Sequence, residues 1–120
     1  MKDERNRDLI ARTKSFALRI IRLYSALPKT TVAQVLGRQL LRSGTSVGAQ
    51  YREANRGKST ADFISKIEGA LQELDETAYW LELLAESKTG SGADLPKLMN
   101  ETEELISIFV TVVKSAKKSR

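Results

Sequence analysis

The stretch Gly57-Lys58-Ser59-Thr60 contains the residue types that close around a nucleotide phosphate. A P-loop, G-x-x-x-x-G-K-[ST], also needs a glycine five residues before Gly57, after a buried strand, so that backbone N–H groups can surround the phosphates. Position 52 is Arg52, and no apolar β-strand pattern precedes it. The stretch therefore does not predict nucleotide binding.

The same residues fit a turn between two helices. Gly57 follows the last residue of a predicted helix and suits a left-handed cap. Ser59 and Asp62, three residues apart, form a capping box that would begin the next helix. We therefore expect a helical hairpin here.

The chain contains neither histidine nor cysteine. Histidine is the usual general base near neutral pH and the commonest metal ligand, and cysteine supplies thiolate nucleophiles, disulfides and zinc–thiolate sites. The Glu-x-x-His pairs of di-metal helix bundles are impossible without histidine. We expect a protein that is not an enzyme, with no catalytic residues, no metal and no cofactor.

Four segments carry apolar or small residues at steps of three and four, the spacing of helices that face a shared core. A chain of 120 residues suits one domain, 1–120, with helices at about 5–27, 31–56, 60–88 and 95–117. Thr30 or Thr31 can cap the second helix, and Pro96 suits the first turn of the fourth. Short connections imply antiparallel neighbours, so the predicted fold class is all-α, an up-down-up-down four-helix bundle.

Each predicted helix has one inward row. The rows are Leu9, Thr13, Phe16, Ile20, Leu23 and Leu27; Leu36, Leu40, Ser43, Val47, Tyr51 and Ala54; Ile64, Ile67, Leu71, Leu74, Ala78, Leu81 and Ala85; and Leu95, Leu98, Thr102, Leu105, Phe109, Val112 and Ala116. Residues 106–113 are β-branched and could form a strand by propensity alone. Glutamates precede this segment and lysines follow it, which matches a helix dipole, so we expect a helix.

The charge is divided unevenly along the chain. Residues 1–58 carry 13 Lys and Arg against 4 Asp and Glu, whereas residues 59–120 carry 7 against 11. In the basic half nine arginines accompany four lysines, and arginine favours bidentate phosphate contacts. The basic half indicates a polyanionic partner, a merely solvated face, or pairing with acidic groups such as Glu73, Glu76 or Glu82 of another subunit.

Several of these basic residues share helix faces. Four arginines of the second helix lie within an arc of about 80° opposite its core row, and arginines seven apart flank the core row of the first helix. The candidate nucleic-acid-binding residues are Arg12, Arg19, Arg38, Arg42, Arg52, Arg56 and Lys58. Among the aromatic residues only Tyr51 lies among the arginines of the second helix, which is a weak sign of base stacking.

Two other features concern packing. Gly44 and Gly48 lie one turn apart in the second helix, where glycine is costly, which predicts close packing of another helix or, less readily, of a ligand. Bulky apolar residues also project away from the core rows, which favours a subunit interface over a ligand groove. The candidate interface residues are Tyr79, Trp80, Leu83, Ile106 and Val110.

The N-terminal residues are charged and have no apolar signal-peptide region, and no run of about 18 apolar residues could cross a membrane. We expect a cytoplasmic protein with no membrane partner.

The segment RSGTSVGAQYREANRGKSTADFISKIEGALQELDETAYWLELL, residues 42–84, resembles the four-helix-bundle family of ribosomal-RNA intervening-sequence proteins. Its second helix carries R-S-x-x-S, and its third runs F-I-x-K and then E-T-x-x-W-L-E-L-L. The matching positions are Arg42, Ser43, Ser46, Gln50, Arg52, Phe63, Glu76, Trp80 and Glu82. Gln50 replaces the asparagine common in the motif, which puts in doubt a contact that needs the shorter amide.

The resemblance implies a homopentameric barrel of bundles. It also implies a relation to the accessory variability protein of diversity-generating retroelements, a basic pentamer that associates with RNA and a reverse transcriptase. The sequence thus favours a non-enzymatic homo-oligomer that binds RNA or DNA backbone through its first two helices. The alternative is an oligomeric scaffold or protein-interaction module that binds no nucleic acid.

Overall fold

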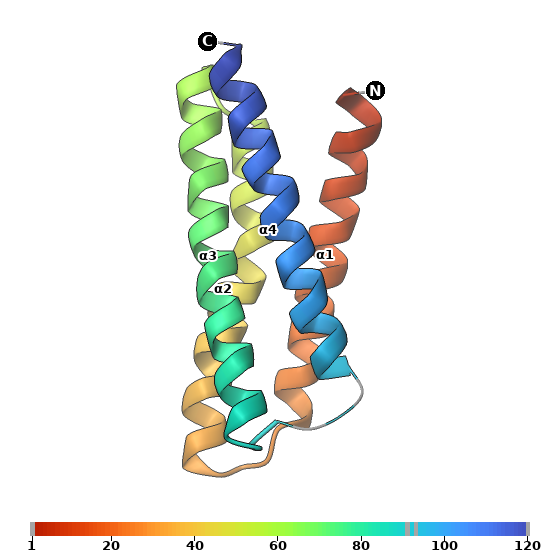
Figure 1. The fold of residues 1–120 in the computed structure, drawn as a ribbon, viewed down its shortest axis with the longest axis vertical. Helices are drawn as coiled ribbons and strands as arrows, with labels where there is room; N and C mark the ends of the chain where they lie inside the picture. The colour runs from red at the N-terminus through yellow and green to blue at the C-terminus, as the bar shows by residue number, and fades with distance from the viewer. Residues whose placement is uncertain (1, 91, 93, 120) are drawn as a thin grey trace.

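The computed structural model describes residues 2–90, 92 and 94–119, with side chains from Glu4 onward. Four helices occupy these residues: α1 (Lys2–Ala26), α2 (Thr31–Asn55), α3 (Thr60–Glu86) and α4 (Asp94–Lys118). Figure 1 shows that each helix runs antiparallel to the next, so both termini lie at the same end of an elongated molecule of 48 × 22 × 20 Å. The predicted four-helix bundle is confirmed, and the β-branched segment 106–113 is helical within α4.

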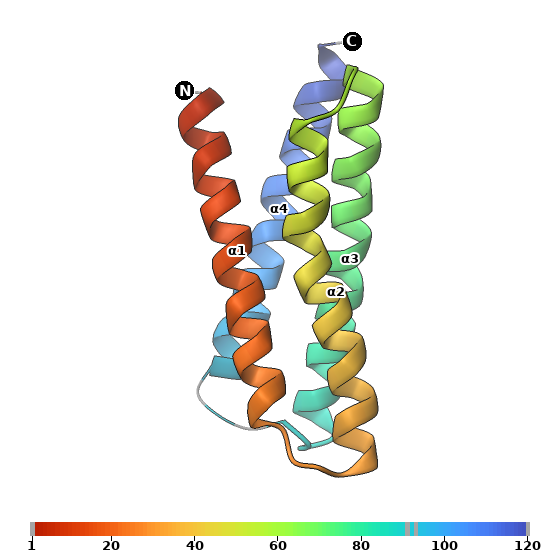
Figure 2. The same cartoon turned by 180° about the vertical axis from the view of Figure 1, so that it is seen from behind.

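The helices are not equally close to one another. α2 and α3 lie against each other along their whole length, whereas α1 leans away from α2 and α4 toward its N-terminus (Figures 1 and 2). The bundle is therefore more open at the end that carries the termini than at the opposite end.

Side-chain caps begin the second and third helices. Thr30 Oγ1 accepts a hydrogen bond from Ala33 N at 3.2 Å, and Ser59 Oγ accepts one from Asp62 N at 3.1 Å. Both hydroxyls satisfy N–H groups that have no partner inside the helix. The Asp62 carboxylate accepts from Lys58 N at 3.3 Å, one residue earlier than in a standard capping box.

The expectation of a left-handed cap at Gly57 was wrong. Its φ lies outside the left-handed region, and its N–H donates to the Ala54 carbonyl at 3.0 Å. The chain needs glycine there because the turn is crowded: a Cβ would lie 2.9 Å from Asp62 Oδ2 and 3.0 Å from Ala54 O. Close approach, rather than backbone conformation, explains this glycine.

The core lies along the bundle axis and contains most of the predicted inward residues. In α1 the whole predicted row is buried. In α3 the prediction was partly wrong, because Ala70, Thr77 and Leu84 are buried where Leu71, Ala78 and Ala85 were expected to be. The hydroxyl of Thr77 can be buried because it has hydrogen-bond partners inside the bundle.

Glycines bring α2 close to α1. A Cβ on Gly44 would lie 2.8 Å from Ile20 Cγ1, and a Cβ on Gly48 would lie 3.2 Å from Thr13 Oγ1. Gly37 meets α1 in the same way, since a Cβ there would lie 2.8 Å from Tyr24 Cδ1. The close-packing interpretation of the glycine pair is confirmed, and the neighbour is α1.

Candidate nucleic-acid interface

The arginines of α2 point outward because the other faces of this helix are occupied. Gly37 and Gly44 face α1, and Ser43 faces Thr77 of α3. The remaining face carries four exposed arginines, as the sequence predicted. These are Arg38, Arg42, Arg52 and Arg56.

Three of the predicted binding residues are engaged by carboxylates of the same chain. Arg12 binds Glu101 with two hydrogen bonds, 2.7 and 2.8 Å long, and also contacts Glu104 at 2.9 Å. The hydrogen bond with Glu101 is the main reason that the pKa of Arg12 lies above its ordinary value. Arg19 Nη2 lies 3.1 Å from Asp94 Oδ1, so both arginines tie α1 to α4.

Arg42 ties α2 to α3. Its Nη1 lies 3.3 Å from Glu73 Oε1, and its Nη2 contacts Glu76. Glu73 and Glu76 are two of the carboxylates for which the sequence suggested pairing with an arginine of another subunit. Their pairing within the chain gives Arg42 a structural role. Phosphate contacts by Arg12, Arg19 and Arg42 stay a prediction. A phosphate would have to compete with the carboxylate that already binds each arginine.

The other four candidates are exposed, and unlike Arg12, Arg19 and Arg42 they are not paired with a carboxylate of the described residues. Within the described part of the chain, no carboxylate oxygen lies within 4.0 Å of the charged groups of these residues. They are Arg38, Arg52, Arg56 and Lys58. We call them the unpaired basic set.

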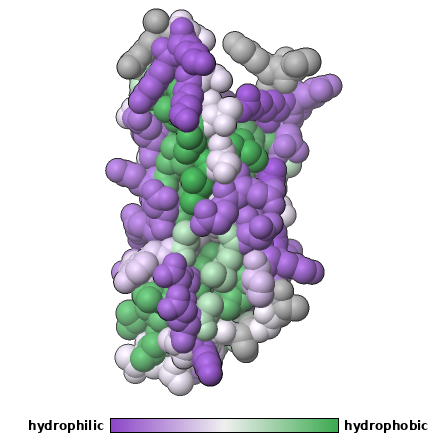
Figure 3. Space-filling view, in the orientation of Figure 1, coloured by the Kyte–Doolittle hydropathy of each residue, from purple (hydrophilic) through white to green (hydrophobic). Residues whose placement is uncertain are grey.

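Three members of this set lie where α2 ends and α3 begins, at the end of the bundle that carries the termini. The antiparallel topology brings basic residues of α1 and α4 to the same end, although those of α4 belong to the acidic half of the sequence. These additional residues are Arg5, Arg7, Lys114, Lys117 and Lys118. Lys117 pairs with Glu68 at 3.3 Å. Hydrophilic side chains project from this end in Figure 3, with apolar surface between them.

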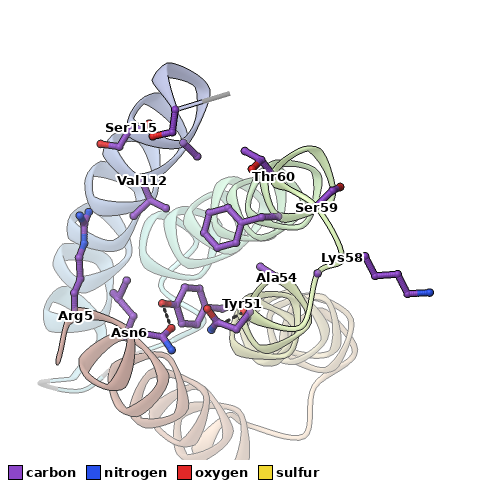
Figure 4. Close-up of a pocket in the computed structure, with 15 residues that line it drawn as sticks. Arg5, Asn6, Tyr51, Ala54, Lys58, Ser59, Thr60, Val112 and Ser115 are labelled. Atoms are coloured by element: carbon purple, nitrogen blue, oxygen red, sulfur yellow. Dashed lines mark hydrogen bonds between the residues drawn. The ribbon is translucent and has the colours of Figure 1, made fainter. Parts of the chain in front are cut away.

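A cleft of about 580 Å³ opens at this end, between α1 and the ends of the other three helices (Figure 4). Its lining includes Leu9, Phe63 and Val112 as well as the side chains of Arg5 and Asn6. The lining residues come from all four helices, and they include no aspartate or glutamate. Sequence reasoning missed this cleft, because each helix contributes only one or two turns to it.

Tyr51 forms one wall of the cleft. Its hydroxyl donates a hydrogen bond to Asn6 Oδ1 at 2.6 Å, and its ring stacks on Phe109 with centroids 5.5 Å apart. The side chain is almost fully buried, and burial raises the pKa of the phenol. Tyr51 is therefore not the exposed stacking residue that its position among the arginines suggested.

The predicted interface residues differ in exposure. Tyr79 is 53% exposed, whereas Trp80, Leu83, Ile106 and Val110 are half-buried. Trp80 packs against the core, and its Nε1 is buried with no hydrogen-bond partner among the described residues. Apolar surface is visible between α3 and α4 in Figure 3. Other large apolar side chains are also exposed, namely Leu18, Ile21, Val32 and Val35.

Two further features are absent from residues 2–90, 92 and 94–119. No described group of three acidic side chains could hold a metal ion. None of the four helices, over the residues described, combines the length and apolar character needed to span a bilayer.

Comparison with known proteins places the chain in a family. The family model described as 23S rRNA-intervening sequence protein matches residues 5–111. A crystal structure from Bacteroides thetaiotaomicron, described as a protein of unknown function from the S23 ribosomal protein family, is 37% identical, with a TM-score of 0.83 over 91% of this chain and 97% of that one. No curated protein matches the chain. Because the family model covers almost the whole sequence, the chain belongs to the 23S rRNA-intervening sequence protein family.

Proposed function

We propose that this protein is a non-enzymatic, homo-oligomeric RNA-binding protein that contacts phosphates through the unpaired basic set on α2 and the following turn. One observation carries the proposal: Arg38, Arg52, Arg56 and Lys58 are exposed and lack a carboxylate partner among the described residues, while Arg12, Arg19 and Arg42 have one. A basic face that existed only for solubility would not need to keep arginines apart from carboxylates. The family name adds a link with ribosomal RNA, which supports RNA over other polyanions.

The proposal predicts the salt dependence of binding. Each phosphate contact with a single strand contributes about −0.7 to the slope of log affinity against log salt concentration, because it releases condensed counterions. Replacing Arg38, Arg52, Arg56 and Lys58 by glutamine should therefore weaken binding to unrelated RNAs about equally. It should also reduce the size of the slope by up to about 3.

The matched control removes four exposed cations that lie elsewhere. These are Lys14, Arg22, Lys29 and Lys97. Fluorescence anisotropy with a labelled 20-nucleotide RNA at several salt concentrations measures both variants. If both variants lost the same RNA affinity, a binding site on α2 would be contradicted. The binding would then depend only on the net charge of the protein. No binding by the parent protein at low salt would contradict the RNA-binding function itself.

The main alternative is an oligomeric scaffold in which the basic face meets acidic residues of another subunit. Arg42 pairs with Glu73 and Glu76 of its own chain, which removes one of the arginines that this alternative needs. Light scattering on the glutamine variant distinguishes the two functions. Dissociation of the oligomer without any RNA affinity in the parent would favour the scaffold.

Two finer parts of the proposal rest on the family resemblance. They are a pentameric assembly and a reverse transcriptase as partner. The mass measured by light scattering tests the first. Co-expression with a retroelement reverse transcriptase, followed by purification of the complex at moderate salt, tests the second.

A further inference from the structure

The cleft at the open end of the bundle has room for one nucleotide. Its volume of about 580 Å³ is within the range of small-molecule sites. It exists because α1 leans away from α2 and α4 toward its N-terminus (Figure 1).

The floor of the cleft suits a planar, partly polar group. Phe63 lines it and is only half-buried, so part of its ring remains available for stacking. Val112 projects into it from α4 (Figure 4). Aromatic and apolar side chains of this kind hold bases that have left a stack.

Two amide side chains add hydrogen-bonding groups at the same place. Asn6 Oδ1 accepts from Tyr51, which leaves its Nδ2 as a donor, and Asn55 Nδ2 donates to the Tyr51 carbonyl at 3.2 Å, which leaves its Oδ1 as an acceptor. A donor and an acceptor that line the same cleft match the edge of a nucleobase. A fatty acid or another aliphatic anion would cover these groups without pairing them.

The charges lie on opposite sides of the opening. Arg5 stands on α1 beside α4, and Lys58 stands on the turn before α3 with its ammonium extending away from the cleft (Figure 4). A strand that inserts one base leaves a phosphate on each side of it. Arg5 can meet one phosphate, and Lys58 can meet the other where the strand leaves over the turn, with Arg56 close by in sequence.

We propose that this cleft binds one unpaired nucleotide of the RNA, with its base against Phe63 and between the amides of Asn6 and Asn55. The inference rests on the proposed RNA-binding function and deepens it. The unpaired basic set provides affinity for any phosphate chain, and the cleft adds a preference for strands with an unpaired base.

A mononucleotide tests the cleft without the rest of the phosphate chain. Uridine 5′-monophosphate at millimolar concentration should shift the amide NMR signals of cleft residues such as Asn6, Asn55 and Phe63. Val112→Phe should abolish these shifts because the larger side chain fills the cleft. Ile108→Phe is the matched control, since Ile108 is also half-buried on α4, one turn earlier, and does not line the cleft.

An oligonucleotide completes the test. A 12-nucleotide single-stranded RNA should bind about tenfold more tightly than the same strand with its central bases removed, and more tightly than a duplex of equal length. In Val112→Phe this difference should disappear, while the salt slope stays that of the parent. Circular dichroism confirms that both phenylalanine variants are folded.

The outcomes separate the two proposals. If RNA binds with the expected salt slope but abasic and intact strands bind equally, and the mononucleotide shifts no cleft amide, the cleft proposal is wrong and the proposed function stands. If no RNA binds, both are wrong. Equal loss of the base-dependent affinity in Val112→Phe and Ile108→Phe would also overturn the cleft assignment.

Discussion

The hydroxyl of Thr77 donates a hydrogen bond to Ser43 Oγ at 2.8 Å in the interface between α2 and α3, where both side chains are fully buried. Thr77 Oγ1 also lies 2.8 Å from the Glu73 carbonyl oxygen. Replacing Thr77 by valine keeps the shape but leaves Ser43 with only a long contact, 3.4 Å, to Leu40 O. Thr77→Val should therefore lower the free energy of unfolding by about 1 kcal/mol.

The double variant Ser43→Ala with Thr77→Val provides the control, because it removes both partners together. Its loss in urea unfolding should be smaller than the sum of the two single losses. Strictly additive losses would show that the two hydroxyls do not interact.

Gly44 and Gly48 should respond differently to alanine. Alanine favours a helix over glycine by about 1 kcal/mol, so a substitution with room for a methyl group would stabilise α2. At Gly44 the methyl group would lie 2.8 Å from Ile20 Cγ1, and Ile20 is a fully buried β-branched residue that has little freedom to move. Gly44→Ala should therefore destabilise the fold by about 1–3 kcal/mol.

Gly48→Ala is the matched comparison, since its nearest contact would be Thr13 Oγ1 at 3.2 Å. Its change in thermal unfolding should be smaller than that of Gly44→Ala. Ile20→Ala removes both Cγ atoms that the new methyl group would meet, so Gly44→Ala with Ile20→Ala should lose less stability than the sum of the two single variants. If Gly44→Ala is as stable as the parent, the helices do not approach as closely as the structure has them.

The sequence predicted the helices well because each carries signals that act locally. Thr30 and Ser59 cap the helices that follow them, and the spacing of apolar residues reports which face of a helix is inward. The error in α3 has a different origin. Thr77 is buried where Ala78 was expected to be, and its hydroxyl pairs with Ser43, which is 34 residues earlier in the chain.

The candidate site could be predicted only in part. That α2 has an arginine face follows from its helical period, but which arginines are paired depends on distant residues. Arg12 and Glu101 are 89 positions apart, and their meeting depends on the register and tilt of α1 against α4. The lysines at the end of α4 were counted with the acidic half, although the antiparallel topology places them at the same end of the bundle as the end of α2.

The ion pair of Arg12 with Glu101 should hold α1 against α4. Both side chains are partly buried and joined by two short hydrogen bonds, so Arg12→Gln should lower the free energy of unfolding by about 1–2 kcal/mol. Hydrogen exchange should quicken in α1 more than in α3, because α1 has its main interface with α2 alone.

Arg19→Gln is the control for this pair, since the side chain of Asp94 is half exposed at 49%. Exposed ion pairs contribute less than about 1 kcal/mol, so its effect should be smaller and should vanish in high salt. A larger loss of unfolding free energy in Arg19→Gln than in Arg12→Gln would contradict the prediction that the Arg12–Glu101 pair is the stronger one.

Tyr51 should make stability fall at high pH. Burial raises the pKa of its phenol above the ordinary 10.0, so below that pH the phenol is protonated in both the folded and the unfolded chain and its contribution is fully present. Above pH 10.0 the unfolded chain loses this proton first, and stability falls as the pH rises through the pKa of the folded state.

Urea unfolding of the parent and of Tyr51→Phe between pH 8 and pH 11.5 isolates this contribution, because the lysines titrate in both proteins. The variant should lose stability at neutral pH with the hydrogen bond to Asn6, and its decline above pH 10 should be shallower. Tyr79→Phe, at an exposed position, should retain the parent's decline. Parallel curves for the parent and Tyr51→Phe would rule out the buried phenol as the cause.

Two exposed apolar surfaces are candidates for the oligomer interface, and substitutions in each can show which one is used. The sequence favoured the surface around Tyr79 and Leu83, but Val32 and Val35 at the start of α2 are exposed to the same extent, 55% and 54% against 53% for Tyr79. Trp80 is a poor position for the test, since it packs against the core and its replacement would damage the fold. The test therefore uses two double variants. One combines Tyr79→Lys and Leu83→Lys, and the other combines Val32→Lys and Val35→Lys.

A charge placed in the centre of an interface is left desolvated without a partner, whereas the same charge on a free surface is harmless. The Tyr79 and Leu83 variant should therefore have the light-scattering mass of a single chain at micromolar concentration, while the valine variant keeps the mass of the parent. Circular dichroism checks that both variants remain helical. The opposite result would move the interface to the start of α2, next to Arg38, and a parent protein that is itself monomeric would remove the oligomer from the proposed function.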